Sequence, residues 1–460
     1  MLKNLDNKYS KKQKGIKNMN NAKTIMKTLK ANGHDSFIVG GCVRDEVLGK
    51  TPHDIDIATT ARPEDINRIF NHGENYFAIP QASANEHGVA FVMFNNEKYE
   101  VATLRADKDC DGRHAIVEFG VSINEDLARR DFTVNAMAKD FEGNIIDPFN
   151  GRDDIKNKII RAVGSPEKRF AEDSLRMLRA VRFASKLGFT IEANTFETIC
   201  KHSSEVVKNV SGDRQREELT KLLSATQANS DEGIKLAIES GLFAAVLPEL
   251  MPMVNCAQNN PHHGLDVMGH TIKAIRVSNT EDTNILWAML LHDAGKPATK
   301  ETGDDGIDHF NGHAKRSHEI AESIMERMHF SNIDKKEILF LVKNHDVVFE
   351  NLSTARRWLA KFGEALLRKL LIVRTADIMA QSTFDRESKL ASLRKSEALL
   401  NEAIATSSAL SVKDLAISGK DLIRAGVTPG PAMGAILNKL LEQVMDNPEL
   451  NTKEQLMALV

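Results

Sequence analysis

The spacing of apolar residues changes once along this 460-residue chain, near residue 155, and this change limits the possible folds more than any other feature. Before it, short apolar runs end at glycine or asparagine, as β-strands do, and alternate with helical patterns. From residue 165 onward nearly every segment has the period of amphipathic helices, and the 12 prolines and 5% aromatic residues also favour helices. We therefore predict an α+β protein with a small N-terminal α/β head and an elongated, all-helical remainder.

Cysteine and charge patterns narrow the protein class. The 4 cysteines lie far apart without a CxxC pair, which favours free thiols in a reducing cytoplasm. No apolar run reaches the roughly 18 residues that span a bilayer, so we expect no membrane partner. The first 18 residues hold six lysines and no apolar core, which predicts a basic, disordered extension rather than a secretory signal. The net charge of −3 indicates that any basic, nucleic-acid-binding surface is local.

The stretch FIVGGCVRDEVLGKTPHDIDIATT (37–60) predicts a triphosphate and metal site. Asp54 and Asp56 are two residues apart, so on a strand they share one face, where Mg²⁺ would relieve their repulsion. Gly40 and Gly41 let the backbone approach phosphate oxygens, and Arg44, on a predicted helix, can fork onto a phosphate. Taken singly, the acids could be a solvent-facing pair and the glycines a tight turn. The combination favours catalysis with two metal ions.

Two later motifs add candidates to the same head. Glu100, on the predicted strand KYEVATLR, could supply a third carboxylate or be an exposed strand residue. Arg130, at a predicted helix start in LARRDFTVNAMA, is a candidate triphosphate contact. Asp131 beside it could orient Arg44 or cap the helix.

These motifs carry a family resemblance. GGCVRD…DID, RRDFTVNAMA, DPFNGRDDI and AEDSLRMLRAVRFASKLGF together closely resemble the class II tRNA nucleotidyltransferases, the CCA-adding enzymes, which share this head with bacterial poly(A) polymerases. The resemblance implies template-independent addition of C, C and A to the 3′ end of tRNA from CTP and ATP, with two Mg²⁺ ions and release of pyrophosphate. It also implies that residues 105–120 form a flexible loop linked to the switch from CTP to ATP. VSGDRQREEL (210–219) would support the neck, with Arg214 and Glu217 in structural roles.

Four charged residues at steps of three follow in the predicted neck: Asp173, Arg176, Arg179 and Arg182. A carboxylate beside a guanidinium matches the donor–acceptor edges of cytosine and adenine, whereas uracil and guanine would be mispaired. The resemblance implies this nucleotide-selecting role for Asp173 and Arg176. Arg179 and Arg182 would reach the phosphates or ribose, or hold the selecting pair. The alternative is a solvated, salt-bridged helix face.

Histidines and aspartates cluster in the middle of the helical half. His292 and Asp293 end an apolar helix in WAMLLHDAGKP, with a histidine upstream and an aspartate downstream. This order resembles the HD phosphohydrolases. The resemblance implies a metal core formed by His270, His292, Asp293 and Asp377. Two further residues, His313 and His345, are candidates for binding a second metal. Such ligands suit Mn²⁺, Ni²⁺, Co²⁺, Fe or Mg²⁺, and a metal-activated water could hydrolyse a phosphodiester or a 2′,3′-cyclic phosphate. A lone helix histidine is more often a core residue. His262 and His263 are predicted to be loop residues.

We expect five segments: a disordered extension (1–21), a nucleotidyltransferase head (22–155), a neck (156–225), a helical body with the HD-type domain (226–385) and a helical, tRNA-binding tail (386–460). The basic segment 354–371 could contact the tRNA backbone or be an amphipathic helix with solvated cations. No feature predicts an obligate protein partner. Three other functions stay open: a poly(A) polymerase or partial CC- or A-adding enzyme, an HD-type phosphohydrolase whose head only binds nucleotide, and a tRNA-binding chaperone with an inactive head.

Overall fold

The computed structural model describes residues 2–52, 54–71, 76–79, 88–108, 116–228, 232–406, 409 and 411–460. The chain divides into two compact units. The first comprises Met1–Ala225 and Glu232–Pro248, and the second comprises Thr226–Asp231 and Glu249–Val460. The first unit therefore continues past residue 225, where the sequence pattern suggested that the neck ends.

A seven-stranded sheet forms the head, in the order β3-β4-β5-β2-β1-β8-β9. Its strands are β1 (Ser36–Val39), β2 (Asp56–Thr59), β3 (Tyr76–Ile79), β4 (Val89–Phe94), β5 (Glu97–Thr103), β8 (Ala138–Lys139) and β9 (Ile145–Ile146). β1 and β2 are antiparallel, whereas β2 and β5 are parallel. The hairpin between β4 and β5 turns at Asn95 and Asn96, whose φ angles of 52° and 65° suit asparagine in a tight turn.

Short helices cover this sheet at α2 (Gly41–Val47), α3 (Pro63–Phe70), α5 (Ile123–Ala128) and α6 (Gly151–Asn157), and β6 (Arg105–Lys108) pairs with β7 (Ile116–Phe119). One local prediction was wrong. Arg130 follows the end of α5 rather than beginning a helix, because the capping box of Ser122 and Glu125 starts α5 earlier. Residues 109–115 of the expected switching loop lie outside the described residues.

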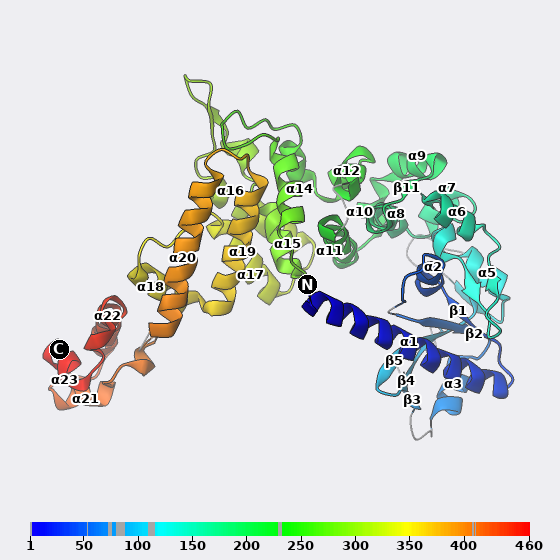
Figure 1. Ribbon diagram of the computed structural model, residues 1–460, viewed down its shortest axis with the longest axis horizontal. Helices are drawn as coiled ribbons and strands as arrows, with labels where there is room; N and C mark the ends of the chain where they lie inside the picture. The colour runs from blue at the N-terminus through cyan, green and yellow to red at the C-terminus, as the bar shows by residue number, and fades with distance from the viewer. Residues whose placement is uncertain are drawn as a thin grey trace. The chain divides into compact units, whose positions relative to one another are not determined.

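The first helix, α1 (Leu2–Ala31), includes the segment that we expected to be disordered. Its first half holds no proline, and lysine, leucine and methionine all favour helices. From Asn18 onward the helix is anchored, with Ala22, Ile25 and Leu29 fully buried, and it contacts β1, β2 and α3. Figure 1 shows α1, in dark blue, running across the strands of the head. The structure therefore describes a helix where the sequence suggested a disordered extension over residues 1–21.

The neck follows the head within the first unit. Its elements are α7 (Pro166–Glu172), α8 (Leu175–Leu187), α9 (Ala193–His202), α10 (Glu205–Asn209), α11 (Gly212–Ala228), α12 (Glu232–Glu239), α13 (Leu242–Val246) and the parallel pair β10 (Ile159–Ile160) and β11 (Thr190–Ile191). Asp173 lies between α7 and α8 with an extended backbone (φ −153°), so the four neck residues do not share one helix as predicted. Asp173, the first of them, lies at the interruption between the two helices.

The second unit is helical, as the apolar period predicted. Its helices are α14 (Val267–Val277), α15 (Thr283–Leu291), α16 (His313–Arg327), α17 (Asn332–Asn344), α18 (Leu352–Phe362), α19 (Glu364–Ala380), α20 (Arg386–Thr406), α21 (Gly419–Arg424), α22 (Pro431–Asp446) and α23 (Lys453–Ala458). A small hairpin joins β12 (Glu301–Thr302) to β13 (Asp308–His309). The basic segment 354–371 spans two helices, because Gly363 between α18 and α19 takes a φ of +78°. None of the described helices combines the length and apolar character needed to cross a bilayer.

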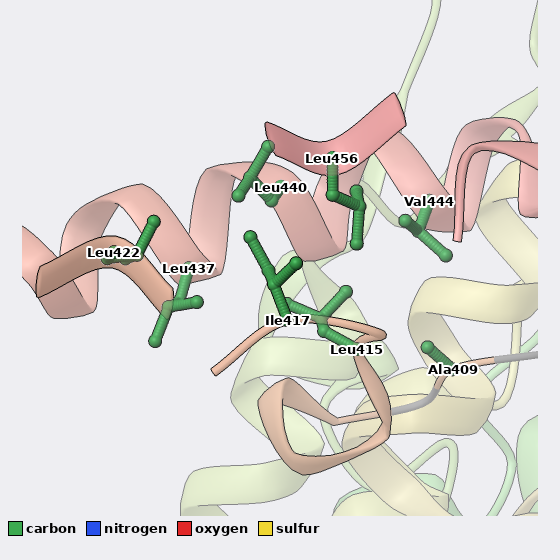
Figure 2. Close-up of a cluster of buried hydrophobic side chains, with 8 residues drawn as sticks. All are labelled: Ala409, Leu415, Ile417, Leu422, Leu437, Leu440, Val444 and Leu456. Carbon is green, nitrogen blue, oxygen red and sulfur yellow. The ribbon is translucent and has the colours of Figure 1, made fainter. Parts of the chain in front are cut away.

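The end of the second unit has a hydrophobic cluster of its own. It consists of Ala409, Leu415, Ile417, Leu422, Leu437, Leu440, Val444 and Leu456. Figure 2 shows Leu437, Leu440 and Val444 along one helix, with Ile417 directed toward them. Buried Arg356 on α18 donates to the Met445 carbonyl oxygen (3.1 Å) and to Thr406 Oγ1 (3.0 Å), and so ties the last helices to α18.

Candidate active site and a second metal-ligand cluster

Three carboxylates meet at the centre of the head. Asp56 is the first residue of β2, and the parallel register sets it beside Glu100 on β5. Asp54 lies in a bend before β2, not on the strand as predicted, yet the alternation holds because Ile55 and Ile57 are buried and the two aspartates are exposed. The Asp56 side chain faces a cavity, but the surrounding protein displaces much of its hydration. This desolvation, followed by the charge of Glu100, raises the pKa of Asp56 to about 6. Such crowding of hard oxygen ligands suits a divalent cation such as Mg²⁺.

The turn between β1 and α2 lies beside these carboxylates, because Val39 at the end of β1 pairs with Asp56. Gly40 has a φ of +74°, and a Cβ there would lie 2.9 Å from Arg130 Nη1, so the backbone and this guanidinium are in close approach. Arg44 is buried and donates to Asn135 Oδ1 (2.7 Å) and to the carboxylate of Asp45. The guanidinium groups of Arg44 and Arg130 therefore both line the site next to a glycine turn. Two such groups suit an anionic ligand.

Asp131 takes neither of the two roles considered for it. Its Oδ2 accepts from Arg179 Nε (2.8 Å), and its Oδ1 accepts from the Phe132 backbone N–H (2.8 Å) and from Asn135 Nδ2 (3.2 Å). It therefore reaches Arg44 only through Asn135. Burial by itself would raise the pKa of Asp131, but Arg179 and these hydrogen bonds outweigh it and lower that pKa.

The neck pair is held by its surroundings. Arg176 donates to Glu172 (2.7 Å) and to two backbone carbonyl oxygens, those of Arg169 (3.0 Å) and Arg129 (2.9 Å). Asp173 accepts from the backbone N–H of Leu175 (3.1 Å) through Oδ1. Both side chains are half-buried, and their positions are fixed before any ligand binds.

Two further arginines pair with buried acids rather than standing free. Arg179 joins Asp131, and Arg182 joins Glu218 on α11 at 2.6 Å. Both also lie against the ring of Phe183, at 5.5 and 4.0 Å from its centroid. Burial lowers the pKa of Arg182 and outweighs the charge of Glu218, which by itself would raise it. Of the roles considered for these arginines, the contacts with Asp131 and Glu218 favour that of holding the site together.

All eleven head and neck candidates line a single cavity of about 860 Å³: Gly40, Gly41, Arg44, Asp54, Asp56, Glu100, Arg130, Asp173, Arg176, Arg179 and Arg182. Sequence reasoning missed several other lining residues, namely Asn135, Lys186 and Lys221, and it assigned Arg214 only a structural role. Arg214 donates to Asp173 Oδ2 at 2.9 Å. Lys186 follows Arg182 by one helical turn, and that spacing is the signal that could have identified it.

The second unit brings together all six residues of the predicted histidine–aspartate cluster, in two groups, His270, His292 and Asp377, and Asp293, His313 and His345. His270 Nε2 lies 3.0 Å from Asp377 Oδ1 and 3.4 Å from His292 Nε2. His313 Nε2 lies 3.1 Å from His345 Nε2. Asp293 joins the groups, with Oδ2 3.2 Å from His292 and Oδ1 3.6 Å from His313.

Three of the histidines are oriented in the same way. His292, His313 and His345 each direct Nδ1 at the backbone carbonyl oxygen three residues earlier, at 2.7, 2.9 and 2.8 Å. A hydrogen bond at Nδ1 leaves Nε2 as the free ligand atom, which is the arrangement of metal-binding histidines. Burial lowers the pKa of His292, but Asp293 and Asp377 outweigh it and raise that pKa to about 10, so the pocket strongly favours positive charge.

A second cavity, of about 410 Å³, opens onto this cluster. Several of its lining residues were not predicted as part of a site, among them His263, Lys296 and Gln381. The ring of His263 packs edge-on against His270 at 5.0 Å, and burial, followed by the charge of Lys296, lowers its pKa to about 3. Lys296 pairs with Asp293 at 2.8 Å.

Family models match three parts of the chain. The Poly A polymerase head domain matches residues 36–161, and the "probable RNA and SrmB-binding site of polymerase A" matches residues 188–253. A putative tRNA nucleotidyltransferase domain 2 matches residues 304–460. The first two matches fall on the head and neck, and the third includes His313, His345 and Asp377.

Curated relatives match the chain along nearly its whole length. The CCA-adding enzyme of Levilactobacillus brevis is 33% identical over 95% of this chain and 96% of its own. The CCA-adding enzyme of Lactobacillus helveticus is 32% identical over 93% of this chain and 92% of its own. Among solved structures, the Bacillus stearothermophilus CCA-adding enzyme in complex with CTP is 29% identical, has a TM-score of 0.70 and covers 96% of both chains. The Thermotoga maritima CCA-adding enzyme complexed with tRNA, at 22% identity and a TM-score of 0.54, shares the fold over 96% of this chain and 94% of its own.

Proposed function

This chain belongs to the CCA-adding enzymes, and from that premise we propose which of its residues carry out the reaction. It is a tRNA nucleotidyltransferase that adds C, C and A to the 3′ end of tRNA from CTP and ATP without a nucleic-acid template. This function is favoured over a poly(A) polymerase, a partial CC- or A-adding enzyme, a phosphohydrolase with a merely nucleotide-binding head, and an inactive chaperone.

Asp54 and Asp56 would hold two Mg²⁺ ions, with Glu100 as a third carboxylate. The fit rests on the donor set, since three carboxylates face one another and the pKa of Asp56 is raised by desolvation and by Glu100. When bound, such ions stabilise the attacking and leaving oxygens of an in-line phosphoryl displacement. The carboxylates themselves orient the tRNA 3′ hydroxyl toward the α-phosphate.

The triphosphate would lie against the glycine turn. Gly40 and Gly41 allow the β1–α2 backbone to approach phosphate oxygens, and Arg44 and Arg130 would donate to them. Because Asn135 and Asp45 already hold Arg44, little side-chain entropy is lost on binding.

Asp173 and Arg176 would select the base. The carboxylate would accept from the exocyclic amine of cytosine or adenine, and the guanidinium would donate to the neighbouring ring nitrogen. Uracil and guanine would leave both groups mispaired, which costs much more than a poor apolar fit. Arg179 and Arg182 would hold the walls of the site through Asp131 and Glu218.

One observation carries this assignment: the carboxylates, the phosphate-binding arginines and the base-selecting pair line the same cavity. The test is to incubate the protein with tRNA lacking CCA, CTP, ATP and Mg²⁺ and to sequence the products. Products that stop after CCA are expected for the wild type and none for Asp56→Asn. Undiminished incorporation by Asp56→Asn would reject the assignment of the catalytic carboxylates.

The second cluster supports a separate, metal-dependent phosphohydrolase activity. The observation that favours it is the shared orientation of the three histidines, with Nε2 facing two aspartates. Mn²⁺ binding, followed by electron paramagnetic resonance in the Asp56→Asn background, is expected to be lost in His292→Ala. Hydrolysis of a 2′,3′-cyclic phosphate should be lost with it. Retention of Mn²⁺ by His292→Ala would reject the metal site.

A further inference from the structure

One side chain connects the histidine–aspartate cluster to the surface beside it. Gln381, after the end of α19, donates through Nε2 to Asp377 Oδ2 at 3.2 Å. Its Oε1 accepts from Lys389 Nζ at 2.6 Å. A cation on α20 is thus one amide group away from a predicted metal ligand, at the rim of the 410 Å³ cavity that Gln381 lines.

Further cations converge on the same residue. The Gln381 carbonyl oxygen accepts from Arg386 Nη2 at 2.6 Å and lies 3.4 Å from Lys273 Nζ. Two neighbouring acids are Asp385, which is exposed, and Glu387, which is paired with Arg394. Asp377, Asp385 and Asp346 also attract Lys389, but Arg374 pairs with two of these acids. Cationic side chains therefore still outnumber acidic ones here, so this rim attracts anions such as phosphate.

An aromatic side chain stands beside these cations. Phe384 is 54% exposed and meets the ring of His262 edge-on, with 5.1 Å between centroids. Its loop is fixed, because Ser382 donates through its backbone N–H to the His262 carbonyl oxygen (2.7 Å) and through Oγ to that of Pro261 (2.6 Å). The exposed ring is therefore held in place rather than free to fold back onto the protein.

We propose that Phe384 and His262, together with Lys389 and Arg386, bind one nucleobase and its adjoining phosphate at the mouth of the second cavity. A fixed aromatic face with cations beside it is the combination by which proteins bind single nucleotides of an RNA strand without reading their sequence. We name this surface the rim site. The inference rests on the proposed second function, and it assigns that cavity a nucleotide ligand, either free or at the end of an RNA strand.

The test measures binding to the full chain carrying Asp173→Ala and Arg176→Ala, which remove base selection in the head. Adenosine monophosphate and ribose 5-phosphate are titrated by calorimetry, and adenosine monophosphate is expected to bind more tightly. Phe384→Ala should lower the affinity for adenosine monophosphate about tenfold and leave the affinity for ribose 5-phosphate unchanged, because only base stacking is lost. Phe384→Trp should retain the affinity. Lys389→Ala should weaken both ligands.

Ile333→Ala, at a 79% exposed apolar residue on α17, is the matched control and should change neither affinity. Equal affinities for the two ligands, or unchanged adenosine monophosphate binding in Phe384→Ala, would overturn the rim site. A trinucleotide that binds more tightly than adenosine monophosphate identifies an RNA end as the ligand, and equal binding identifies the free nucleotide. Mn²⁺ binding, measured on the same protein, separates the proposed metal site from the rim site. If nucleotide binds but Mn²⁺ does not, only the metal site is contradicted.

Discussion

Asp173 and Arg176 illustrate what a single residue can and cannot determine in this enzyme. Their donor–acceptor chemistry matches cytosine and adenine, so the pair could be proposed from the sequence and the resemblance. Arg214 was expected to support the neck, but its hydrogen bond to Asp173 and the hydrogen bonds of Arg176 to Glu172 and to the Arg129 carbonyl oxygen could not be proposed, because they depend on the folded chain. Selection of cytosine and adenine over the other bases should therefore depend both on Asp173 and Arg176 and on the groups that hold them.

We predict that Asp173→Ala loses base selection before it loses catalysis. The variant leaves Arg176 without its complementary acceptor, so the preference for CTP over UTP should fall on the order of 100-fold, as expected when a polar contact is removed. The kcat/KM for each nucleotide with tRNA lacking CCA measures this. Glu167→Ala, an exposed acid on the neighbouring α7, is the control. An unchanged CTP/UTP ratio would exclude Asp173 from selection.

Asp131 gives a pH prediction. Because its pKa is lowered in the folded protein, its contribution to stability is fully present above the unfolded value of about 3.9 and is lost as the pH falls through the lower folded value. Asp131→Asn should therefore reduce the free energy of unfolding by about 1–3 kcal/mol at pH 7. The difference from wild type should shrink below pH 4.

Urea unfolding of both proteins at pH 7 and pH 3 measures this difference. Asp65→Asn, which removes an exposed pair with Arg68, should have little effect at either pH. A pH-independent effect of Asp131→Asn would mean that packing, and not the ion pair with Arg179, is responsible.

At the scale of elements, the β1–α2 turn decides how closely the backbone approaches phosphate. Gly40→Ala introduces a Cβ 2.9 Å from Arg130 Nη1 at a φ of +74°. We expect displacement of Arg130 and a rise in KM for CTP and ATP of roughly tenfold, the loss of about one charge-assisted hydrogen bond. Steady-state kinetics with both nucleotides measure it.

Gly33→Ala is the matched control for this prediction, because its φ of +84° imposes a similar backbone strain while nothing lies within 4 Å of the added Cβ. It should lower thermal stability without changing KM. A similar rise in KM for both variants would attribute the effect to strain in the head and not to contact with Arg130.

Helices and strands could be predicted from the sequence where apolar residues kept the same spacing over a long segment. The helical second unit and the β4–β5 hairpin follow from apolar spacing and from the Asn95–Asn96 turn. Three boundaries were not predictable: α1 begins at Leu2, Asp173 interrupts a helical pattern, and Gly363 divides a basic segment into α18 and α19. The interruptions at Asp173 and Gly363 each depend on a single backbone angle, whereas the start of α1 has a helix-favouring composition in a lysine-rich segment that suggested disorder.

At the scale of the whole molecule, the two cavities described above lie in different compact units, and each has its own chemistry. We predict that the two activities can be removed separately. His292→Ala should abolish Mn²⁺ binding by the second cluster and leave the kcat of CCA addition within about twofold of wild type, since its side chain is buried in the second unit.

Asp56→Asn should have the opposite effect, with CCA addition lost and Mn²⁺ binding at the second cluster retained. Thermal unfolding of both variants checks that neither is globally destabilised. If His292→Ala slows CCA addition without lowering thermal stability, the second cluster contributes to tRNA handling rather than acting independently.

The hydrogen bonds of Arg176 have a consequence for how this enzyme tolerates sequence drift. Two of its three partners are main-chain carbonyl oxygens, at Arg169 and Arg129, which every amino acid carries. No substitution at those two positions can delete the acceptor atom. Replacing Arg169 would still remove its ion pair with Glu172, the third partner of Arg176, so the protection applies to the two main-chain hydrogen bonds alone. Insertions and deletions differ, because they shift the chain itself. The two main-chain hydrogen bonds that position the base-selecting guanidinium should therefore tolerate amino-acid substitutions better than insertions or deletions.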